Sequence, residues 1–229
     1  MVTVVNIGPD MYGPSMPGNS LRGLTFHVVG GNALIQQLFS SEGARQRGLE
    51  HSDIIVFQGG TDVGPNLYHA IPHHLTDKPD MRRDRMEQAL YHELDKRQFR
   101  VGICRGAQFL NVMNGGRLWQ HVENHTTAHE VRYVTETDLE RAYMVSSTHH
   151  QMMMPKFPEA VVWAWAKETN IREFPDGKKI ELSPQVWKDY EVIHYPKSNS
   201  LCFQPHPEYN TPKQTRELFL RCMLRMIES

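Results

Sequence analysis

The sequence predicts an α/β fold, in which a mainly parallel central sheet has helices on both faces. Short apolar segments rich in β-branched residues alternate along the chain with longer amphipathic ones, and this alternation favours parallel strands joined by helices. The 229 residues suit one domain with a sizeable core. Neither an internal repeat nor a linker divides the chain, so we expect a single domain over residues 1–229.

Composition narrows the classes of function. The formal net charge is −1 and no basic run is present, which argues against nucleic-acid binding. The absence of a long apolar segment argues against a membrane span, and the N-terminus lacks the pattern of a secretory signal. Three cysteines are too few for a disulfide framework and fit a reducing compartment. We therefore expect a cytoplasmic protein.

The first part of the chain contains two expected strands and one helix. Val2–Ile7 is a short β-branched run and predicts a buried strand. The Gly/Pro/Ser-rich stretch Gly8–Gly23 predicts a surface loop. Asn32–Gly48 has apolar residues at helical spacing, and Asp53–Phe57 predicts a second buried strand that ends in the loop QGGTDVGP.

Asp80–Gln98 predicts an amphipathic helix, with Met86, Leu90 and Leu94 on its apolar face and charges opposite. Arg100–Ile103 predicts a strand that leads directly into Cys104. The next helix, Gly106–Met113, ends at an Asn-Gly-Gly stop signal.

In the second half, the stretch from Arg117 to Gln151 is polar and rich in histidine. Strands are expected at Ala160–Ala166 and Ser200–Phe203. The last helix begins at Thr211-Pro212, a capping residue followed by a first-turn proline, and runs to the C-terminus.

The stretch RVGICRGAQFLNVMNGG predicts a nucleophile site. A strand, a tight turn at Cys104 and a helix expose a side chain at the carboxyl edge of a sheet. Glycines at 102 and 106 flank the turn, and the helix start favours the reactive thiolate. The N–H of Arg105 is then available to an oxyanion. The alternative is a packed core cysteine at a strand end, the role we expect for Cys202 and Cys222.

The segment QPHPEY supplies a partner for that thiol. Prolines on both sides of His206 favour extended backbone, in which His206 and Glu208 point the same way. The carboxylate can then orient the imidazole and leave its other nitrogen for the thiol.

Two further segments are candidates for the same site. Phe57 leads into Gly59-Gly60, where backbone N–H groups can supply the second oxyanion donor; the alternative is an ordinary glycine turn. Val145 to Gln151 is a dense polar cluster after an expected strand. It either lines a pocket for an amino-acid-like substrate or is a solvated loop.

The abundance of histidine raises the alternative of a metal site. His121, His125 and His129 are spaced four apart and would align on a helix. The segment favours loop or strand, however, and no cysteine or aspartate completes a recognised ligand spacing. We therefore expect no metal and no other cofactor.

Taken in order, GGTDV, RDRMEQAL, GICRGAQFLNVMNGGRLWQ, SSTHHQ and QPHPE resemble the class I glutamine amidotransferases. They are most similar to the γ-glutamyl hydrolase-like branch, which includes the γ-glutamyl-γ-aminobutyrate hydrolases. The resemblance runs from about Asp53 to Tyr209. Two departures are Pro205, where the family carries an aromatic residue, and the stretch 168–190, which is longer than the family's connection.

The resemblance implies a flavodoxin-like fold and a catalytic triad of Cys104, His206 and Glu208. It also implies an oxyanion hole from the amides around Gly60 and Arg105. Residues implied in substrate binding are Gly59, Gln108, Ser147, Thr148 and His149.

The implied activity is hydrolysis of γ-glutamyl amide bonds through a thioester, with glutamine or a γ-glutamyl amine as the small-molecule substrate. The alternative is a glutaminase subunit that delivers ammonia to a separate synthetase partner. A homo-oligomer is left open. A third class, a binding module without catalysis, is disfavoured by the intact cysteine, histidine and glutamate.

Overall fold

The computed structural model describes residues 20–134, 140–166, 171–173, 179–181, 188–209 and 211–229. The expected strand Val2–Ile7 and most of the loop Gly8–Gly23 lie outside the described residues. Within the described part of the chain, none of the helices is long and apolar enough to cross a membrane.

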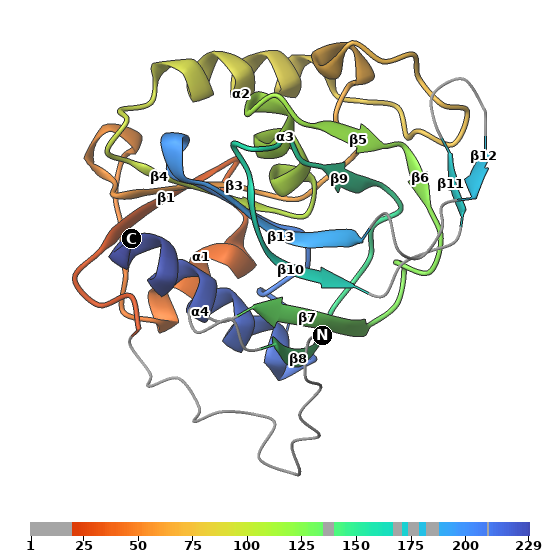
Figure 1. Cartoon of the computed structure of the whole chain (residues 1–229). Coiled ribbons are helices and arrows are strands. Elements are labelled where there is room, and N and C mark those ends of the chain that lie inside the picture. Colours follow the sequence, from red (N-terminus) through yellow and green to blue (C-terminus); the bar gives the residue numbers. More distant parts are fainter. Residues whose placement is uncertain (1–19, 135–139, 167–170, 174–178, 182–187, 210) are drawn as a thin grey trace.

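One half of the central sheet is parallel (Figure 1). Its strands run in the order β2-β1-β3-β4-β14, and each neighbouring pair is parallel. The strands are β1 (Thr25–Val29), β2 (Arg45–Gln46), β3 (Ile54–Phe57), β4 (Phe99–Ile103) and β14 (Ser200–Phe203). The carboxyl ends of β3, β4 and β14 therefore meet at one edge, which is where ligands bind in open α/β sheets.

The other half continues the sheet with antiparallel strands in the order β14-β13-β10-β7-β8. These are β13 (Asp189–Tyr195), β10 (Val161–Ala166), β7 (His129–Val134) and β8 (Glu140–Val145), with β9 (Met152–Met154) and β5 (Arg117–Trp119) branching from β13. In the long 168–190 stretch, β11 (Ile171–Glu173) and β12 (Lys179–Glu181) pair with each other, and β11 also pairs with β6 (His121–Val122).

Helices cover both faces of the sheet (Figure 1). They are α1 (Ala33–Ser41), α2 (Met81–Glu93), α3 (Arg105–Met113) and α4 (Lys213–Glu228), with short 3-10 turns η1 (Leu49–His51), η2 (Pro65–Tyr68) and η3 (Pro196–Ser198). α1 and α4 pack on one face, while α2 and α3 pack on the other.

β3 shows how the two faces are built. All four of its residues are buried, because a strand with helices on both faces is apolar throughout. Ile54 and Val56 pack in the core with α1 and α4, whereas Ile55 and Phe57 pack in the core with α3. The strand's period of two thus directs alternate side chains to opposite layers.

Several expected elements differ from the structure. The helix predicted over Asn32–Gly48 ends at Ser41, after which the chain enters β2; Asn32 caps its start by accepting the N–H groups of Leu34 and Ile35. Strands β1 and β13 are among those that were not predicted. In β13 the acidic residues Asp189 and Glu191 interrupt the apolar pattern, although both are fully buried.

The predicted orientation of α2 was wrong in part. Met86, expected on the apolar face, is 62% exposed, while Asp84 and Glu87 are buried. The physical reason is a buried guanidinium: Arg105 pairs with both carboxylates, so this helix turns charges inward.

Candidate active site

Cys104 occupies a sharp turn between β4 and α3. Its backbone has φ 52° and ψ −113°, a conformation that is costly for a residue with a side chain. The turn is tight because α3 approaches the sheet closely: a Cβ on Gly102 would lie 2.3 Å from the carbonyl oxygen of Gly106. One on Gly106 would lie 2.0 Å from the carbonyl oxygen of Phe57. Glycine at these two positions therefore permits the turn that presents the sulfur.

His206 lies beside Cys104 because β4 and β14 are parallel neighbours. The two strands pair up to Ile103 and Phe203, and the N–H of Cys104 donates to the Phe203 carbonyl at 3.0 Å. A Cβ on Gly59 would lie 3.3 Å from His206 Cε1 and 3.7 Å from Cys104 Cβ. The thiol and the imidazole thus flank the same glycine.

The imidazole of His206 is held on every side. Its Nδ1 lies 2.9 Å from Glu208 Oε1, and its Nε2 lies 3.0 Å from Thr148 Oγ1. The Ser146 hydroxyl accepts the His206 N–H at 3.0 Å and donates to the His206 carbonyl at 2.9 Å. The ring also stacks on Tyr209, with centroids 4.4 Å apart. The ring is therefore fixed without a bound ligand.

The surroundings favour the protonated form of His206. Burial opposes the charge, but hydrogen bonds with Cys104 and Glu208 outweigh it and raise the pKa of His206 to about 10. A ring that holds a proton beside a sulfur is suited to act as a general acid.

Arg83 of α2 fixes the backbone of the glycine loop after β3. Its guanidinium donates to the carbonyl of Gln58 at 2.7 Å and to that of Gly59 at 2.9 Å. In a trans peptide the N–H points opposite to the C=O, so the N–H groups of Gly59 and Gly60 face away from Arg83. Gly60 has φ 148°, a backbone conformation that favours glycine, and a Cβ there would lie 2.3 Å from Arg83 Nη1 and displace the guanidinium.

A buried network of charges joins this loop to the nucleophile turn. Arg105, directly after Cys104, pairs with Asp84 and Glu87 of α2. Glu87 also accepts from Arg83 at 2.7 Å, and Asp84 accepts the N–H of Gly64 at 2.9 Å. Burial raises the pKa of Asp84, and the Arg105 guanidinium opposes that rise. The network therefore links both candidate oxyanion donors through one helix.

This network was not predicted from the sequence. A signal was nevertheless present: Asp84 and Glu87 share a helical face with Leu90 and Leu94, at spacings of three and four residues. Charges within an apolar stripe indicate a buried counter-ion, here Arg105.

Three other predicted site residues have protein partners. Gln108 Nε2 lies 3.3 Å from both the Gln151 carbonyl and Gln204 Oε1. Ser147 donates its hydroxyl to the His125 carbonyl, and His149 Nδ1 lies 2.9 Å from the Gln151 carbonyl. Their roles in substrate binding stay predictions.

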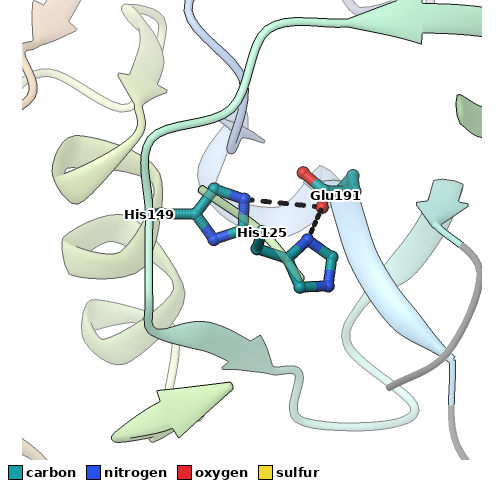
Figure 2. A group of neighbouring side chains, drawn as sticks. All are labelled: His125, His149 and Glu191. Carbon is teal, nitrogen blue, oxygen red and sulfur yellow. Dashed lines mark ion pairs between the residues drawn. The ribbon is translucent and has the colours of Figure 1, made fainter. Parts of the chain in front are cut away.

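The three histidines considered as an alternative metal site, His121, His125 and His129, do not lie together. His121 lies near His73 and His150. His125 and His149 lie beside Glu191 (Figure 2). His129 Nε2 also lies 3.1 Å from Glu191 Oε1.

Comparison with known proteins assigns the fold and points to a family. The family model described as Peptidase C26 matches residues 25–181. Protein NtpR from Enterococcus hirae is 32% identical over 167 residues, which cover 64% of this chain and 70% of that protein. A putative glutamine amidotransferase-like protein, the YvdE homolog of Lactococcus lactis subsp. cremoris, is 36% identical over 119 residues, which cover 44% of this chain. The match spans 63% of that relative, slightly under two thirds.

A solved structure confirms the predicted fold class. A putative GMP synthase subunit from Thermoplasma acidophilum aligns with a TM-score of 0.61, covering 90% of this chain and 97% of that one. At 15% identity, this similarity concerns the fold alone. The flavodoxin-like arrangement expected for class I glutamine amidotransferases is therefore present.

Proposed function

Because this chain belongs to the Peptidase C26 family of class I glutamine amidotransferase-like proteins, we propose that it is a cysteine-dependent hydrolase of γ-glutamyl amide bonds. The observation that carries the proposal is that Cys104 and His206 flank Gly59 at adjacent strand ends, with His206 Nδ1 2.9 Å from Glu208 Oε1. A nucleophile, a base and a residue that orients the base are what acyl transfer through a covalent intermediate requires.

In the proposed first step, the Cys104 sulfur attacks the γ-carbonyl carbon, and the carbonyl π electrons move to oxygen. The N–H of Arg105 is the first donor to this oxyanion, because the first residues of a helix have N–H groups without intrahelical acceptors. The N–H of Gly60, oriented by the Arg83 clamp, is the second.

In the second step, the tetrahedral intermediate collapses to a thioester and the C–N bond breaks. His206 gives its Nε2 proton to the leaving amine or ammonia. The neutral ring then takes a proton from water as the water attacks the thioester, and glutamate is released. Glu208 keeps its hydrogen bond to Nδ1 throughout and stabilises the charged ring.

Replacement of the nucleophile tests the proposal. We expect Cys104→Ala to lower kcat by about 10⁴-fold or more, because the covalent route is lost. The matched control is Cys202→Ala, which removes a buried thiol from β14 in the core shared with α3 and should retain turnover. Release of glutamate from a panel of γ-glutamyl amines, γ-glutamyl peptides and glutamine is followed by mass spectrometry. Turnover by Cys104→Ala equal to that of the control would refute the proposal.

The same assay separates this proposal from ammonia delivery to a synthetase. The isolated chain should hydrolyse γ-glutamyl amines unaided if it is a stand-alone hydrolase. Hydrolysis of glutamine alone, and only when a synthetase is added, would favour ammonia delivery. The name of the aligned GMP synthase protein is what makes a synthetase partner worth testing.

A further inference from the structure

A second cluster of buried polar side chains lies close to the proposed active site but takes no part in its chemistry. His125 follows β6, His149 lies between β8 and β9, and Glu191 lies on β13 (Figure 2). All three are buried, with exposed fractions of 2%, 3% and 0%. Their ligand-type atoms, one from each residue, all lie within 4.8 Å of one another.

In His125 and His149 the ring N–H points away from the carboxylate of Glu191. His149 Nδ1 lies 2.9 Å from the Gln151 carbonyl, which can only accept a hydrogen bond, so this nitrogen carries the proton. His125 Nε2 lies 2.9 Å from the Asp189 carboxylate and donates in the same way. An imidazole that donates one N–H to a carbonyl or carboxylate, and turns its other nitrogen inward, has the arrangement typical of a metal-bound histidine.

The inward nitrogens converge on one oxygen. His125 Nδ1 lies 3.2 Å and His149 Nε2 lies 3.5 Å from Glu191 Oε1, yet neither nitrogen has a hydrogen-bond partner. In neutral rings both present lone pairs to a carboxylate oxygen, an arrangement that is repulsive and costly when buried. A cation among the three atoms would turn the repulsion into attraction.

The spacing suits a small tetrahedral cation. Zn²⁺ with bonds of about 2.0–2.1 Å places neighbouring ligand atoms about 3.3–3.4 Å apart. Glu191 Oε1 lies 3.2 and 3.5 Å from the two nitrogens, close to this value, and the two nitrogens lie within 4.8 Å of each other. His129 also contacts this carboxylate: its Nε2 lies 3.1 Å from Glu191 Oε1, and its Nδ1 lies 3.1 Å from the Thr127 carbonyl.

We propose that His125 Nδ1, His149 Nε2 and Glu191 Oε1 bind a divalent transition-metal ion, with Zn²⁺ the best match. The three ligands are buried and take no part in the proposed hydrolysis, so we assign the ion a structural role. The ion would tie the loop after β8 to β13. That loop contains Thr148, which contacts His206, so the metal would also help to position the proposed active site.

Metal binding by the intact chain, produced without a histidine tag, tests the inference independently of activity. Protein stripped with a chelator is titrated with ZnCl₂ by calorimetry. We expect one equivalent to bind and the melting temperature to rise. His125→Gln and Glu191→Gln should each weaken binding by more than about 100-fold, since loss of an outer partner alone costs 10–100-fold. Asp189→Asn, which changes such a partner, should weaken it by about 10–100-fold.

Two control variants make the test specific. His194→Gln changes a buried histidine on the same strand as Glu191, packed against Trp163, and should bind Zn²⁺ like the wild type. His150 belongs to a second cluster of possible metal ligands, with Asp62 and Asp77. His150→Gln should also leave Zn²⁺ binding intact. Absence of stoichiometric binding by the wild type, or loss of binding in a control but not in His125→Gln, would overturn the inference.

A spectroscopic measurement covers the case in which ligand variants fail to fold. Co²⁺ added to the stripped wild-type chain should give the intense visible absorption of tetrahedral Co²⁺ with nitrogen and oxygen ligands, and Zn²⁺ should displace it. The weak spectrum of six-coordinate Co²⁺ would overturn the inference, because it would show that the histidines do not converge on the ion.

Discussion

The residues of the candidate site are held by contacts that leave little freedom. Cys104 is kept at positive φ by the close packing of α3 on β3 and β4. His206 has its ring, its N–H and its carbonyl all bound by neighbours. Such strain and such restraint are typical of functional sites, where geometry is set before a ligand arrives.

The charge of His206 predicts how stability depends on pH. Its folded-state pKa, about 10, lies above the unfolded value of 6.5. Its contribution to stability is therefore complete below pH 6.5 and is lost as the pH rises toward 10. Glu208→Gln removes one source of the shift and should flatten this part of the curve. Urea denaturation across this range measures the difference, and parallel curves for the two proteins would contradict the prediction.

At the scale of elements, α2 acts as a brace between two loops. It carries Arg83, which holds the glycine loop, and Asp84 and Glu87, which hold Arg105 beside Cys104. The amphipathic pattern predicted the helix but gave it the wrong inner face at Met86. Its contacts with both loops are made by those inward charges.

Loss of the Arg83 clamp should affect catalysis more than folding. Arg83→Met frees the carbonyls of Gln58 and Gly59, so the Gly60 N–H loses its fixed direction. We expect kcat to fall by about 10²–10³-fold, the cost of one oxyanion donor, with KM changed much less. Arg85→Met, an exposed neighbour on the same helix, is the matched control. Steady-state kinetics of γ-glutamyl hydrolysis give kcat and KM for both variants. Equal kcat values for Arg83→Met and Arg85→Met would contradict the prediction.

Loss of the buried guanidinium should affect stability. Arg105→Met leaves the carboxylates of Asp84 and Glu87 buried without that partner, and breaking a buried ion pair costs about 3–5 kcal/mol. The comparison is Arg97→Met, which breaks an exposed pair with Asp95 and should cause no measurable loss. The free energy of unfolding in urea distinguishes the two, and equal losses would show that the network adds nothing to stability.

At the scale of the whole molecule, the ring of Phe219 packs α4 against α1 and the central sheet, beneath the candidate site. The Phe219 ring of α4 lies 5.9 Å from that of Phe39 on α1 and 5.1 Å from that of Phe203 on β14, the strand that leads to His206. The side chain is fully buried. The parallel half of the sheet is thus supported by helices that are far apart in the sequence.

A cavity at this position should destabilise the whole fold. Phe219→Ala is expected to lower the free energy of unfolding by about 3–5 kcal/mol, because the transfer energy is lost and the space cannot fully collapse. Phe157→Ala, at a side chain that is 54% exposed, should change it little. Thermal and urea unfolding measure both variants, and a small effect at Phe219 would indicate that the core relaxes around the gap.

The elements around the nucleophile could be predicted because their signals are local. The apolar run of β4, the Asn-Gly-Gly stop and the prolines around His206 are each read from a few adjacent residues. The strand β13 was missed because its buried Asp189 and Glu191 resemble surface positions. The histidine cluster was missed because its members come from segments that only the folded sheet brings together. Partners distant in sequence leave no local pattern.

Thr148 and His149 are consecutive, yet they serve two different sites. The hydroxyl of Thr148 meets the imidazole of His206, whereas the ring of His149 turns toward Glu191. Deleting one residue from this loop, or inserting one, would exchange these two directions and disturb both sites at once. Relatives of this chain should therefore keep the length of this loop, and tolerated insertions should cluster elsewhere.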